Sequence, residues 1–365
     1  MGETNGSTAA ASIVCRWCRS PAGGSVDSAA ARLLHRCAMA SAPRVVMDPA
    51  ATYRRLVPVD RLASPITPVD DVYVIAHMGI AHVDVARWRL RIDGLVERPF
   101  EVDYSGLTAL PAIEVTAVLE CFGNPVEPDV ATRRVGNVVW RGVRLAELLE
   151  RAGVLPEARY VCAEGVDSGS FANVHSDRYV KDLPLARALE PDVLVAWAMN
   201  GSPLSAEHGF PARVFIPGYF GTNAVKWLAR LTLSSQRPES LFTTRLYNRR
   251  VDGETRPVRE LDVHAVIVAP ADGATIAPGR HIVSGWAWSA WPVRAVEISI
   301  DGGARWQPAR VASRGADHQW QAFTYVWDVV TPGRHALQIR AVDECGRIQP
   351  AAGRNRIHTI SVAVA

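Results

Sequence analysis

Cys121 is the residue whose type and position carry the clearest chemistry. It follows the apolar run Val115–Leu119 and opens a loop with Gly123 and Asn124, two residues that tolerate unusual backbone angles. A thiol at the end of a strand faces a pocket more readily than one in mid-strand, and its thiolate is a soft metal ligand. The sequence therefore indicates either a metal-binding thiolate or a buried cysteine that packs as a small apolar side chain.

A second cluster gathers cationic side chains within a short stretch. His208 and Arg213 are followed by Lys226, one of only two lysines in the chain, and the glycines around them permit close backbone approach. Such a set suits a bound anion such as a phosphate, through charge-assisted hydrogen bonds. The stretch lacks the glycine spacing of a P-loop or of a dinucleotide fingerprint, so ordinary nucleotide folds are not supported. A solvated turn is the alternative interpretation.

Three further groups of residues have both a chemical and a structural interpretation. The segment Tyr73–His77 is a predicted strand that ends in a histidine, although a lone histidine is usually structural. Asp167 falls in a predicted turn, where a solvated acid is common. Soft ligands that suit zinc occur near the N-terminus: Cys15, Cys18, His35 and Cys37. Their irregular spacing favours unstructured thiols instead.

The composition is that of a folded protein with two domains. The chain has 365 residues, 48% hydrophobic and 21% charged, and domains commonly contain about 150 residues. The net charge of +3, from 40 basic and 37 acidic residues, is too small to imply nucleic-acid binding. No apolar run approaches the roughly 20 residues that cross a bilayer. We therefore expect no nucleic-acid partner and no membrane span.

The six cysteines and the N-terminal residues bear on the compartment. The cysteines are too sparse and irregular for the disulfide framework of a small secreted domain. The first residues match neither a secretory signal peptide nor a myristoylation site. The sequence therefore predicts a reducing compartment and a cytoplasmic location, or a periplasmic one if the true start lies elsewhere.

Changes of pattern divide the chain into three parts. Residues 1–47 are rich in Ala, Ser, Gly and Arg without periodicity, and we interpret them as a flexible or wrongly started extension. Residues 48–262 mix strands such as 193–199 with a helix over 143–152, which predicts an α+β domain. Residues 263–365 contain short strands separated by turn residues, typical of an immunoglobulin-like antiparallel β-sandwich.

Taken together, these segments resemble the sulfite oxidase family of molybdopterin enzymes. The matching motifs occur in the family's order and approximate spacing: Glu120–Asn124, Val139–Val143, His208–Pro211 with Arg213, and Val225–Trp227. The C-terminal sandwich, with Ser299–Gly303 and Trp306, is similar to the family's dimerisation domain. The resemblance implies a molybdopterin-binding catalytic domain over 48–262 and one molybdenum–molybdopterin per chain.

The resemblance also implies roles for individual residues. Cys121 would ligate molybdenum, and Tyr247 would be the active-site tyrosine beside the metal. The segments that hold the pterin and its phosphate match a further set of residues: Tyr73, His77, Asp167, His208, Arg213, Ala224, Val225 and Lys226. In such enzymes one oxygen atom is exchanged with a small-molecule substrate and molybdenum takes two electrons.

The chain departs from the family pattern at the arginines that bind substrate. Sulfite-oxidising members usually carry Arg-Asn-His where this chain has Ile75–His77, and often two arginines where it has Pro125–Val126. A further arginine is expected in the region that here contains Trp320–Phe323. A dianion needs several cationic donors, each worth about 1.5–3 kcal/mol, so we expect a substrate less charged than sulfite. Other arginines that would have to replace the missing ones are Arg133, Arg134 and Arg245.

Electron transfer and assembly also follow from the resemblance. The chain has no Cys-x-x-Cys-His haem motif, because Arg19 follows Cys18, so electrons would pass to a separate cytochrome or another acceptor. The family implies a homodimer. Two alternatives stay open: a reductase of a sulfoxide-like or nitrate-like oxygen donor on the same scaffold, and a non-catalytic module that has lost the cofactor. A degenerate module has no need for the five retained residues Cys121, His208, Arg213, Lys226 and Tyr247.

Overall fold

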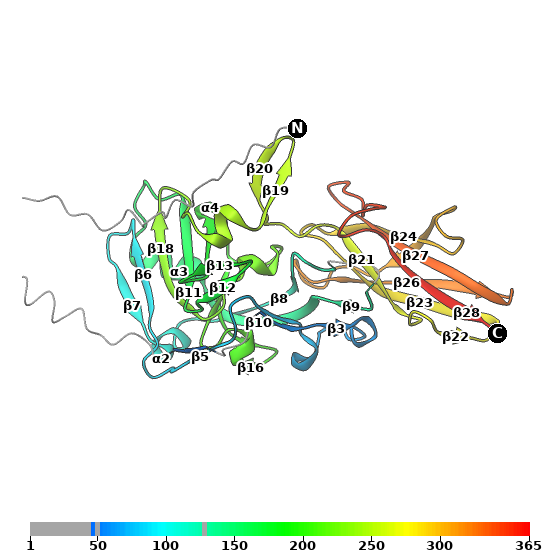
Figure 1. The fold of residues 1–365 in the computed structure, drawn as a ribbon, viewed down its shortest axis with the longest axis horizontal. Helices are drawn as coiled ribbons and strands as arrows, with labels where there is room; N and C mark the ends of the chain where they lie inside the picture. Colours follow the sequence, from blue (N-terminus) through cyan, green and yellow to red (C-terminus); the bar gives the residue numbers. More distant parts are fainter. Residues whose placement is uncertain (1–44, 48–51, 126–129) are drawn as a thin grey trace, which may run out of the picture. The chain divides into compact units, whose positions relative to one another are not determined.

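The computed structural model describes residues 45–47, 52–125 and 130–365, drawn in colour in Figure 1. The soft ligands near the N-terminus and Val126 lie outside the described residues. Within the predicted extension over residues 1–47, Val45–Met47 form strand β1, which pairs with β5 (Ala81–Val83). The boundary at residue 47 stays a prediction.

The first large sheet leads directly to Cys121. Its order is β16-β15-β10-β8, with β17 also paired to β15. The strands are β8 (Ile113–Glu120), β10 (Val135–Arg144), β15 (Leu194–Met199), β16 (Ser202–Pro203) and β17 (Arg213–Phe215). Every residue of β15 is buried, as its unbroken apolar sequence predicts. In the antiparallel β8–β10 pair Glu120 lies opposite Val135, so the Cys121 loop starts at the end of a well-anchored strand.

The second large sheet has the order β14-β11-β18-β6-β7. Its strands are β6 (Leu90–Gly94), β7 (Phe100–Val102), β11 (Tyr160–Gly165), β14 (Val180–Pro184) and β18 (Leu228–Ser234). The parallel pair β6–β18 ends at Gly94, whose φ is +85° and where a Cβ would lie 2.2 Å from the Leu233 carbonyl oxygen. Only glycine permits that approach.

Helices are short in the part of the chain that the structure describes. They are α2 (Tyr104–Thr108), α3 (Leu145–Ala152), α4 (Leu185–Ala188), the 3-10 turns η1 (Val59–Arg61), η2 (Val69–Asp71), η3 (Ala206–His208) and η4 (Gly221–Asn223), and the π-helical η5 (Leu241–Arg245). Helix α3 ends at Gly153, whose φ of +72° suits a glycine cap, as predicted for residues 143–152. Strand residues far outnumber helical ones in the described part of the chain, so the predicted α+β class overstates the helix content.

Four small two-stranded sheets also occur in the described residues, and one of their strands, β4, lines the cavity described below. They pair β2 (Tyr53–Arg55) with β4 (Val74–Ala76), β3 (Val57–Pro58) with β9 (Thr132–Arg133), β12 (Gly169–Phe171) with β13 (Val174–Ser176), and β19 (Asn248–Val251) with β20 (Glu254–Pro257). Strand β4 ends directly before His77, as predicted. The pairing of β4 with β2 therefore fixes the backbone position of His77.

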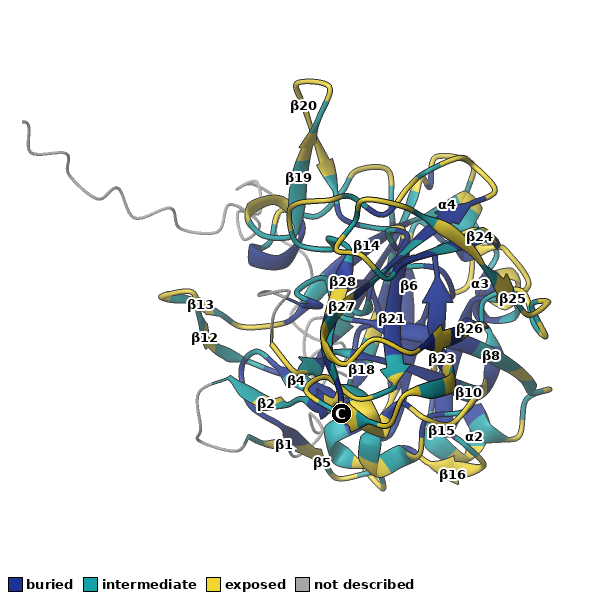
Figure 2. Cartoon of the chain, turned by 90° about the vertical axis from the view of Figure 1, so that its right-hand side faces the viewer, coloured by how far each residue is buried: buried dark blue, intermediate teal, exposed yellow. Residues whose placement is uncertain are grey.

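The C-terminal strands follow the order β21-β23-β26-β25-β24-β27-β28-β22. They are β21 (His264–Ala269), β22 (Thr275–Ile276), β23 (Gly279–Trp288), β24 (Val293–Ser299), β25 (Gln307–Val311), β26 (Gln321–Val329), β27 (Gly333–Asp343) and β28 (His358–Val364). Alternate residues such as Val283, Phe323 and Leu337 form one buried core, and the burial colours of Figure 2 separate buried strand interiors from exposed loops. This part is β-structured, as predicted.

Tryptophans join the C-terminal strands to the first sheet. Trp286 and Trp320 stack with ring centroids 4.6 Å apart, and both belong to one buried cluster with Trp140 of β10. Their indole N–H groups donate to the carbonyl oxygens of Leu62 at 2.5 Å and Pro65 at 2.8 Å. The amphipathic rings thus combine apolar contact with satisfied polar atoms.

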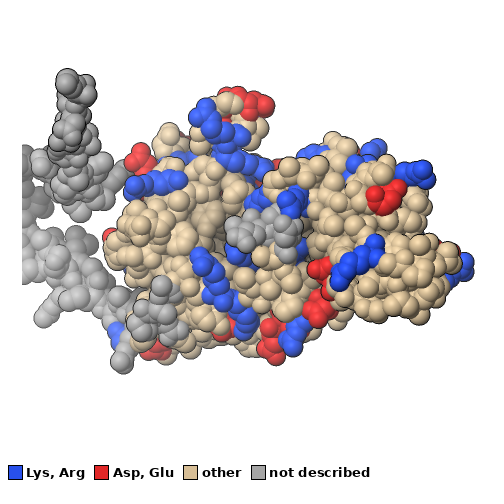
Figure 3. Space-filling model, turned by 45° about the vertical axis from the view of Figure 1, so that its right-hand side comes forward, with Lys and Arg blue, Asp and Glu red and all other residues tan. Residues whose placement is uncertain are grey.

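Charge is dispersed on the face of the molecule shown in Figure 3. The face shown in Figure 3 carries acidic and basic side chains in small separate groups with uncharged surface between them. This agrees with the near balance of 40 basic and 37 acidic residues. None of the helices in the described ranges is long and apolar enough to cross a membrane.

Candidate functional site

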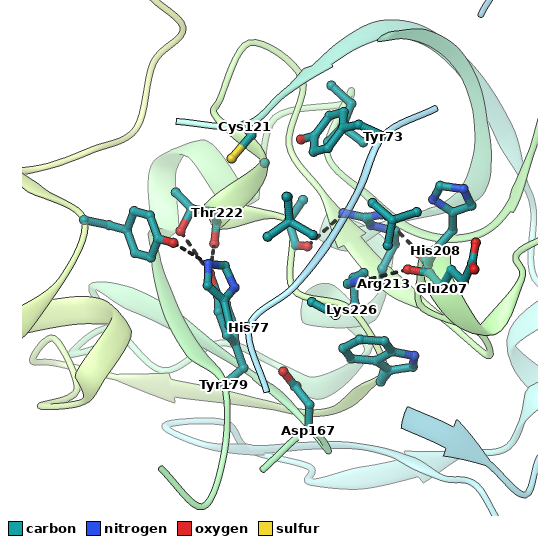
Figure 4. A pocket seen from close by; sticks show the side chains of 18 residues that line it. Tyr73, His77, Cys121, Asp167, Tyr179, Glu207, His208, Arg213, Thr222 and Lys226 are labelled. Carbon is teal, nitrogen blue, oxygen red and sulfur yellow. Dashed lines mark hydrogen bonds between the residues drawn. The ribbon is translucent and has the colours of Figure 1, made fainter. Parts of the chain in front are cut away.

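One cavity collects nearly all of the predicted site residues. Its wall includes Tyr73, His77, Cys121, Asp167, His208, Arg213, Ala224, Lys226 and Tyr247. Figure 4 shows their side chains around a common space, with the Cys121 sulfur and the Asp167 carboxyl on opposite sides in this view. Val225 differs, because its side chain is fully buried in the core and does not line the cavity.

Cys121 is held at the cavity wall by hydrogen bonds with Arg134, the residue before β10, and with Gly123 of its own loop. Its N–H donates to the Arg134 carbonyl at 2.9 Å, and its Sγ accepts from the Gly123 N–H at 3.4 Å. Burial raises the pKa of the thiol, while the Gly123 hydrogen bond and the Arg134 guanidinium act in the opposite direction. These two groups favour the thiolate, the form that binds a metal.

Glu120 fixes the start of the Cys121 loop, and the sequence analysis did not single it out. Its carboxylate is buried and accepts from Trp288 Nε1 at 2.8 Å and Asn124 Nδ2 at 3.0 Å. His264 Nδ1 lies 3.3 Å from the same carboxylate. The Asn124 side-chain oxygen accepts from the Arg134 N–H at 2.7 Å. The loop is therefore tied both to Arg134, directly before β10, and to the C-terminal strands β21 and β23.

Arg354, in the segment before β28, also stabilises the Cys121 loop. Its Nη1 donates to the Asn124 carbonyl at 3.2 Å, and its other terminal nitrogen pairs with Asp262. The guanidinium lies 4.7 Å from the centroid of the Phe122 ring and 5.1 Å from that of Phe220. Cation–π contacts of this kind stabilise the aromatic wall next to Cys121.

Tyr247 and His77 form a short hydrogen-bonded pair. The Tyr247 hydroxyl lies 2.5 Å from His77 Nε2, and Tyr247 has a φ of +57°, an uncommon value for a non-glycine residue. Burial, with Lys226 and Arg54, lowers the pKa of His77 to about 3, and burial raises the pKa of Tyr247. The imidazole is therefore neutral. In the tautomer that carries its proton on Nε2, it donates to the tyrosine hydroxyl.

Aromatic rings surround this pair. The His77 ring centroid lies 4.5 Å from that of Phe171, 5.6 Å from that of Phe242 and 5.8 Å from that of Tyr179. These rings remove water from around the Tyr247 hydroxyl and leave His77 as its hydrogen-bond partner. Desolvation of this kind strengthens the electrostatic effect of any charge that develops nearby.

Asp167 and Lys226 bring opposite charges to the cavity. The Lys226 ammonium donates to the Glu207 carbonyl at 2.8 Å and lies 4.1 Å from the centroid of the Trp227 ring. Burial raises the pKa of the Asp167 carboxyl and lowers that of the Lys226 ammonium, while each charge favours the other's ionised form. Asp167 is buried, so the alternative of a solvated loop acid is wrong.

Arg213 is a buried cation whose hydrogen-bond acceptors are uncharged backbone carbonyl groups. Its terminal nitrogens donate to the carbonyls of His208 at 3.1 Å and Ala224 at 3.0 Å, and it lies 5.1 Å from the Trp140 ring centroid. Within the described ranges, Arg213 Nε and Asp167 Oδ1 are buried without a hydrogen-bond partner. Such orphaned polar atoms at a cavity wall indicate that a polar ligand completes the site. The alternative of a solvated turn at His208 and Arg213 is wrong, because both are buried.

Other residues of the cavity wall were not predicted from the sequence. Tyr179 donates to the Thr222 carbonyl at 2.8 Å, which fixes both side chains at the wall. At Gly221 a Cβ would lie 2.7 Å from the Tyr73 hydroxyl, so the wall has no room for a larger residue there. Among these residues, only Gly221 carries a usable signal in the sequence, as one of the glycines between Arg213 and Lys226.

Replacing His208 by glutamine is expected to reduce the acid sensitivity of the fold. Burial first, then Arg213, Lys226 and Arg55, lower the pKa of His208 from 6.5 to about 3. Between these values the unfolded chain binds a proton that the folded chain excludes, so the free energy of unfolding falls as the pH drops. The loss is about 1.4 kcal/mol per pH unit for one such group.

Urea unfolding at about pH 7.5 and 5.5 measures this contribution, since that interval includes the ordinary histidine pKa. The His208→Gln variant should lose about 1.4 kcal/mol less than the wild type over this interval. The exposed His175, 65% accessible, supplies the control His175→Gln, which should behave as the wild type does. Equal losses in all three proteins would contradict a buried neutral His208.

Comparison with known proteins defines the class. Residues 77–242 match the oxidoreductase molybdopterin binding domain, and residues 255–362 match the Mo-co oxidoreductase dimerisation domain. The solved structure of the sulfane dehydrogenase SoxCD from Paracoccus pantotrophus is similar with a TM-score of 0.77 and 28% identity. The alignment covers 95% of this chain and 94% of that one.

Two relatives found by sequence comparison indicate the same class of protein. Mitochondrial sulfite oxidase of Rattus norvegicus is 32% identical over 319 residues, which cover 79% of this chain and 58% of the relative. Nitrate reductase [NAD(P)H] of Hordeum vulgare is 31% identical over 339 residues, which cover 80% of this chain and 38% of the relative. This chain therefore spans little more than half of the rat protein. It belongs to the sulfite oxidase family of molybdopterin-dependent oxidoreductases.

Proposed function

We propose that this chain is a molybdenum-dependent oxidoreductase that carries out two-electron oxygen-atom transfer. The observation that carries the proposal is the single cavity in which the Cys121 thiol, the Tyr247–His77 pair and the buried cations Arg213 and Lys226 meet. A thiol at a strand end, a hydroxyl in a dry aromatic setting and cations suited to a phosphate are the protein groups that such a cofactor needs.

The residues present fit a molybdopterin. A set of three or more His, Cys, Asp or Glu side chains able to hold a metal does not occur among the described residues. A lone Cys121 thiolate therefore suits a metal whose other ligands arrive with a cofactor. The unpartnered atoms Asp167 Oδ1 and Arg213 Nε suit a ligand with hydrogen-bond donors at one end and an anion at the other.

Different residues of the cavity would bind the metal, the phosphate and the pterin of the cofactor. Cys121 would ligate the metal, and Arg213, His208 and Lys226 would hold the phosphate. Tyr73, His77, Asp167, Ala224 and the backbone of Val225 would hold the pterin. When bound, the cofactor supplies the oxygen-atom and two-electron chemistry. Tyr247, shielded from water, would accept a hydrogen bond from the Nε2–H tautomer of His77 and donate its own proton in a hydrogen bond to the oxygen that is transferred.

We propose a substrate less charged than sulfite. Ile75 and Ala76 lie on the cavity wall, at positions where the family's sulfite-oxidising members are expected to carry Arg-Asn. An apolar wall gives a dianion no donor to replace its lost hydration, whereas a sulfur compound of lower charge loses less on entry. The name of the similar sulfane dehydrogenase is compatible with a sulfur substrate outside the sulfite class.

A kinetic comparison tests this substrate class. With ferricyanide as acceptor, we expect kcat/KM for sulfite to be lower than for a singly charged or neutral sulfur substrate of similar size. Restoring the cation with Ile75→Arg should raise kcat/KM for sulfite selectively. Sulfite turnover with a micromolar KM in the unmodified chain would contradict the proposal of a less charged substrate.

Turnover in the reductive direction is the second candidate. It is favoured by the same missing arginines and by the similarity to a nitrate reductase. Reduced viologen dye with nitrate or a sulfoxide separates the two directions. Dye oxidation by these donors, without ferricyanide reduction by sulfur substrates, would establish the reductase.

The proposal also covers the domains of the chain and its electron-transfer partner. We propose that residues 48–262 form the catalytic domain and residues 263–365 an immunoglobulin-like dimerisation domain, supported by the all-β strand order and by the dimerisation model over residues 255–362. Electrons would pass to or from a separate cytochrome or another acceptor. Stopped-flow mixing of reduced protein with a c-type cytochrome tests this partner directly.

Elemental analysis of purified protein tests the enzyme proposal as a whole. The chain is expressed in a host that makes molybdopterin, molybdenum is measured by mass spectrometry, and released pterin is measured by fluorescence. About one molybdenum and one pterin per chain are expected, since the family carries one cofactor in each catalytic domain. Absence of both from folded protein would favour a non-catalytic module.

A further inference from the structure

Lys181 is a buried cation that has no part in the proposed cofactor site. It lies on β14, is 2% accessible and does not line the cavity around Cys121. It is one of only two lysines in the chain, and the other, Lys226, is assigned to the phosphate. A buried ammonium is costly to the fold, and an apolar side chain of similar volume is often tolerated as well or better. The charge at this position therefore points to a role beyond packing.

The Lys181 ammonium holds the backbone of η5. Its Nζ donates to the Phe242 carbonyl at 2.8 Å. Arg237 supports the next residue of the same turn, because its Nη2 donates to the Thr243 carbonyl at 3.2 Å. Two cations thus bind successive carbonyl groups of this π-helical turn. Tyr247 follows two residues after the end of η5, so the turn that Lys181 holds also sets the position of Tyr247.

The same ammonium lies over the Tyr247 ring, 5.6 Å from the ring centroid. At this distance a cation is attracted to the face of an aromatic ring. A positive charge beside a phenol also favours loss of the phenol proton, so it makes the hydroxyl a stronger hydrogen-bond donor. Lys181 therefore acts on Tyr247 in two ways, through the backbone of η5 and through its charge.

The charged groups around Lys181 come from three segments of the chain. Asp182, the next residue on β14, is buried and is bound by Arg237 at 2.8 Å and by Arg259 at 2.9 Å. The small cavity beside Lys181 and Asp182 is otherwise lined by uncharged side chains of the described residues. Burial, with Arg237 and Arg259 and against Asp182, lowers the pKa of Lys181 from 10.5 to about 8. The ammonium is thus charged at neutral pH and loses its charge in mildly alkaline solution.

We propose that Lys181 is a positioning residue for Tyr247, which it holds through the Phe242 carbonyl and strengthens as a hydrogen-bond donor through its charge. The inference rests on the proposed function, in which the Tyr247 hydroxyl donates to the transferred oxygen. Once deprotonated, the Lys181 amine can still donate to Phe242, but it no longer polarises the Tyr247 ring. Turnover should therefore fall as the pH rises and Lys181 loses its proton.

Nuclear magnetic resonance of the cofactor-loaded chain, labelled with ¹³C at lysine Cε and tyrosine Cζ, tests the contact without any turnover. Two lysines give two lysine signals, and Lys181→Met assigns them. The Lys181 signal should titrate with a midpoint of about pH 8. The Tyr247 signal, assigned with Tyr247→Phe, should shift with the same midpoint. In Lys181→Met that step in the Tyr247 signal should be absent.

The pH profile of kcat tests the effect on the reaction. Wild-type kcat should fall with the midpoint of the Lys181 signal. Lys181→Met should lower kcat about tenfold at about pH 7 and match the wild type at about pH 9.5, where the wild-type amine is neutral. Lys181→Arg keeps a positive charge over this interval, so it should retain most of the activity and lack the alkaline fall. KM should change little in either variant.

The matched control is Arg159→Met. Arg159 also donates to two backbone carbonyls, those of Pro156 at 2.6 Å and Ala158 at 2.9 Å, but it is exposed and does not line the cavity. This variant should keep both kcat and its pH profile, and circular dichroism verifies that each variant is folded.

Two results would overturn the inference. One is a Tyr247 signal without a step at the Lys181 midpoint in the wild type, a measurement that needs no variant of Lys181 to fold. The other is an alkaline fall in kcat that persists unchanged in Lys181→Met. Coupled Lys181 and Tyr247 signals in a loaded protein that turns over no substrate would support the contact and contradict the proposed function, so the two failures are distinguishable.

Discussion

Replacing Glu120 by alanine is expected to lower the free energy of unfolding by about 3–5 kcal/mol, a range typical of breaking a buried charged network. The Glu120 carboxylate is buried and accepts hydrogen bonds from Trp288 and Asn124, with His264 also in contact. Its removal leaves these polar groups without their acceptor inside a low-dielectric core. The Cys121 loop should loosen at the same time, because Asn124 loses one of the hydrogen bonds that hold it.

Glu114 on the same strand supplies the control. It forms an exposed ion pair with Arg141 at 3.3 Å, where the two side chains are 53% and 52% accessible. Glu114→Ala should therefore cost at most about 1 kcal/mol. Guanidinium unfolding of both variants measures the difference. Similar losses for Glu114→Ala and Glu120→Ala would show that the buried network does not stabilise the fold.

Replacing Tyr247 by phenylalanine is expected to lower kcat about 10²-fold, the effect of one well-placed hydrogen-bond donor. The hydroxyl is the group that meets His77 Nε2 at 2.5 Å, and a phenylalanine keeps the ring contacts with Phe242 and Phe122. The proposed role lies in the reaction step, so kcat should fall while KM changes little. Steady-state rates with the best substrate from the ferricyanide and viologen assays measure this.

Tyr325 provides the matched control for that variant. Its hydroxyl donates to Gln307 at 2.8 Å on the C-terminal strands, in an exposed hydrogen bond away from the cavity. Tyr325→Phe should leave kcat unchanged. If Tyr247→Phe turns over as fast as the wild type, the hydroxyl does not act on the transferred oxygen, and the proposed role of Tyr247 is wrong.

Local patterns were sufficient to predict much of the strand framework. The apolar run before Cys121 predicts β8, and the strand that ends in His77 predicts β4. Helical spacing closed by Gly153 predicts α3. These signals survive because each reflects a short-range constraint, namely a buried strand, a turn or a helix cap, that the tertiary structure leaves in place.

Other features depend on long-range contacts that have no local signal. The partners of Glu120 lie 144 and 168 residues away, at His264 and Trp288. Burial of Asp167 depends on how its turn packs, whereas its sequence resembles an ordinary solvated turn. Val225 lies beside true wall residues, but its side chain points into the core, a difference of orientation between adjacent positions.

In the C-terminal part, two strands also lack a local sequence signal. Strands β25 and β28 did not stand out in the sequence, because β25 contains Pro308 and is largely exposed, and β28 follows a long irregular segment. Their pairing becomes visible only once β24, β26 and β27 are in place. Register between distant strands is set by the whole sheet.

X-ray absorption at the molybdenum edge, on wild type and Cys121→Ser purified from a host that makes the cofactor, tests the central claim most directly. Metal–sulfur and metal–oxygen distances differ enough to count the sulfur neighbours. The wild type should show one sulfur neighbour more than the variant, and the variant should retain the sulfurs of the pterin. Equal numbers of sulfur neighbours in the two proteins would contradict ligation by Cys121, and with it the assignment of this cavity as the molybdenum site.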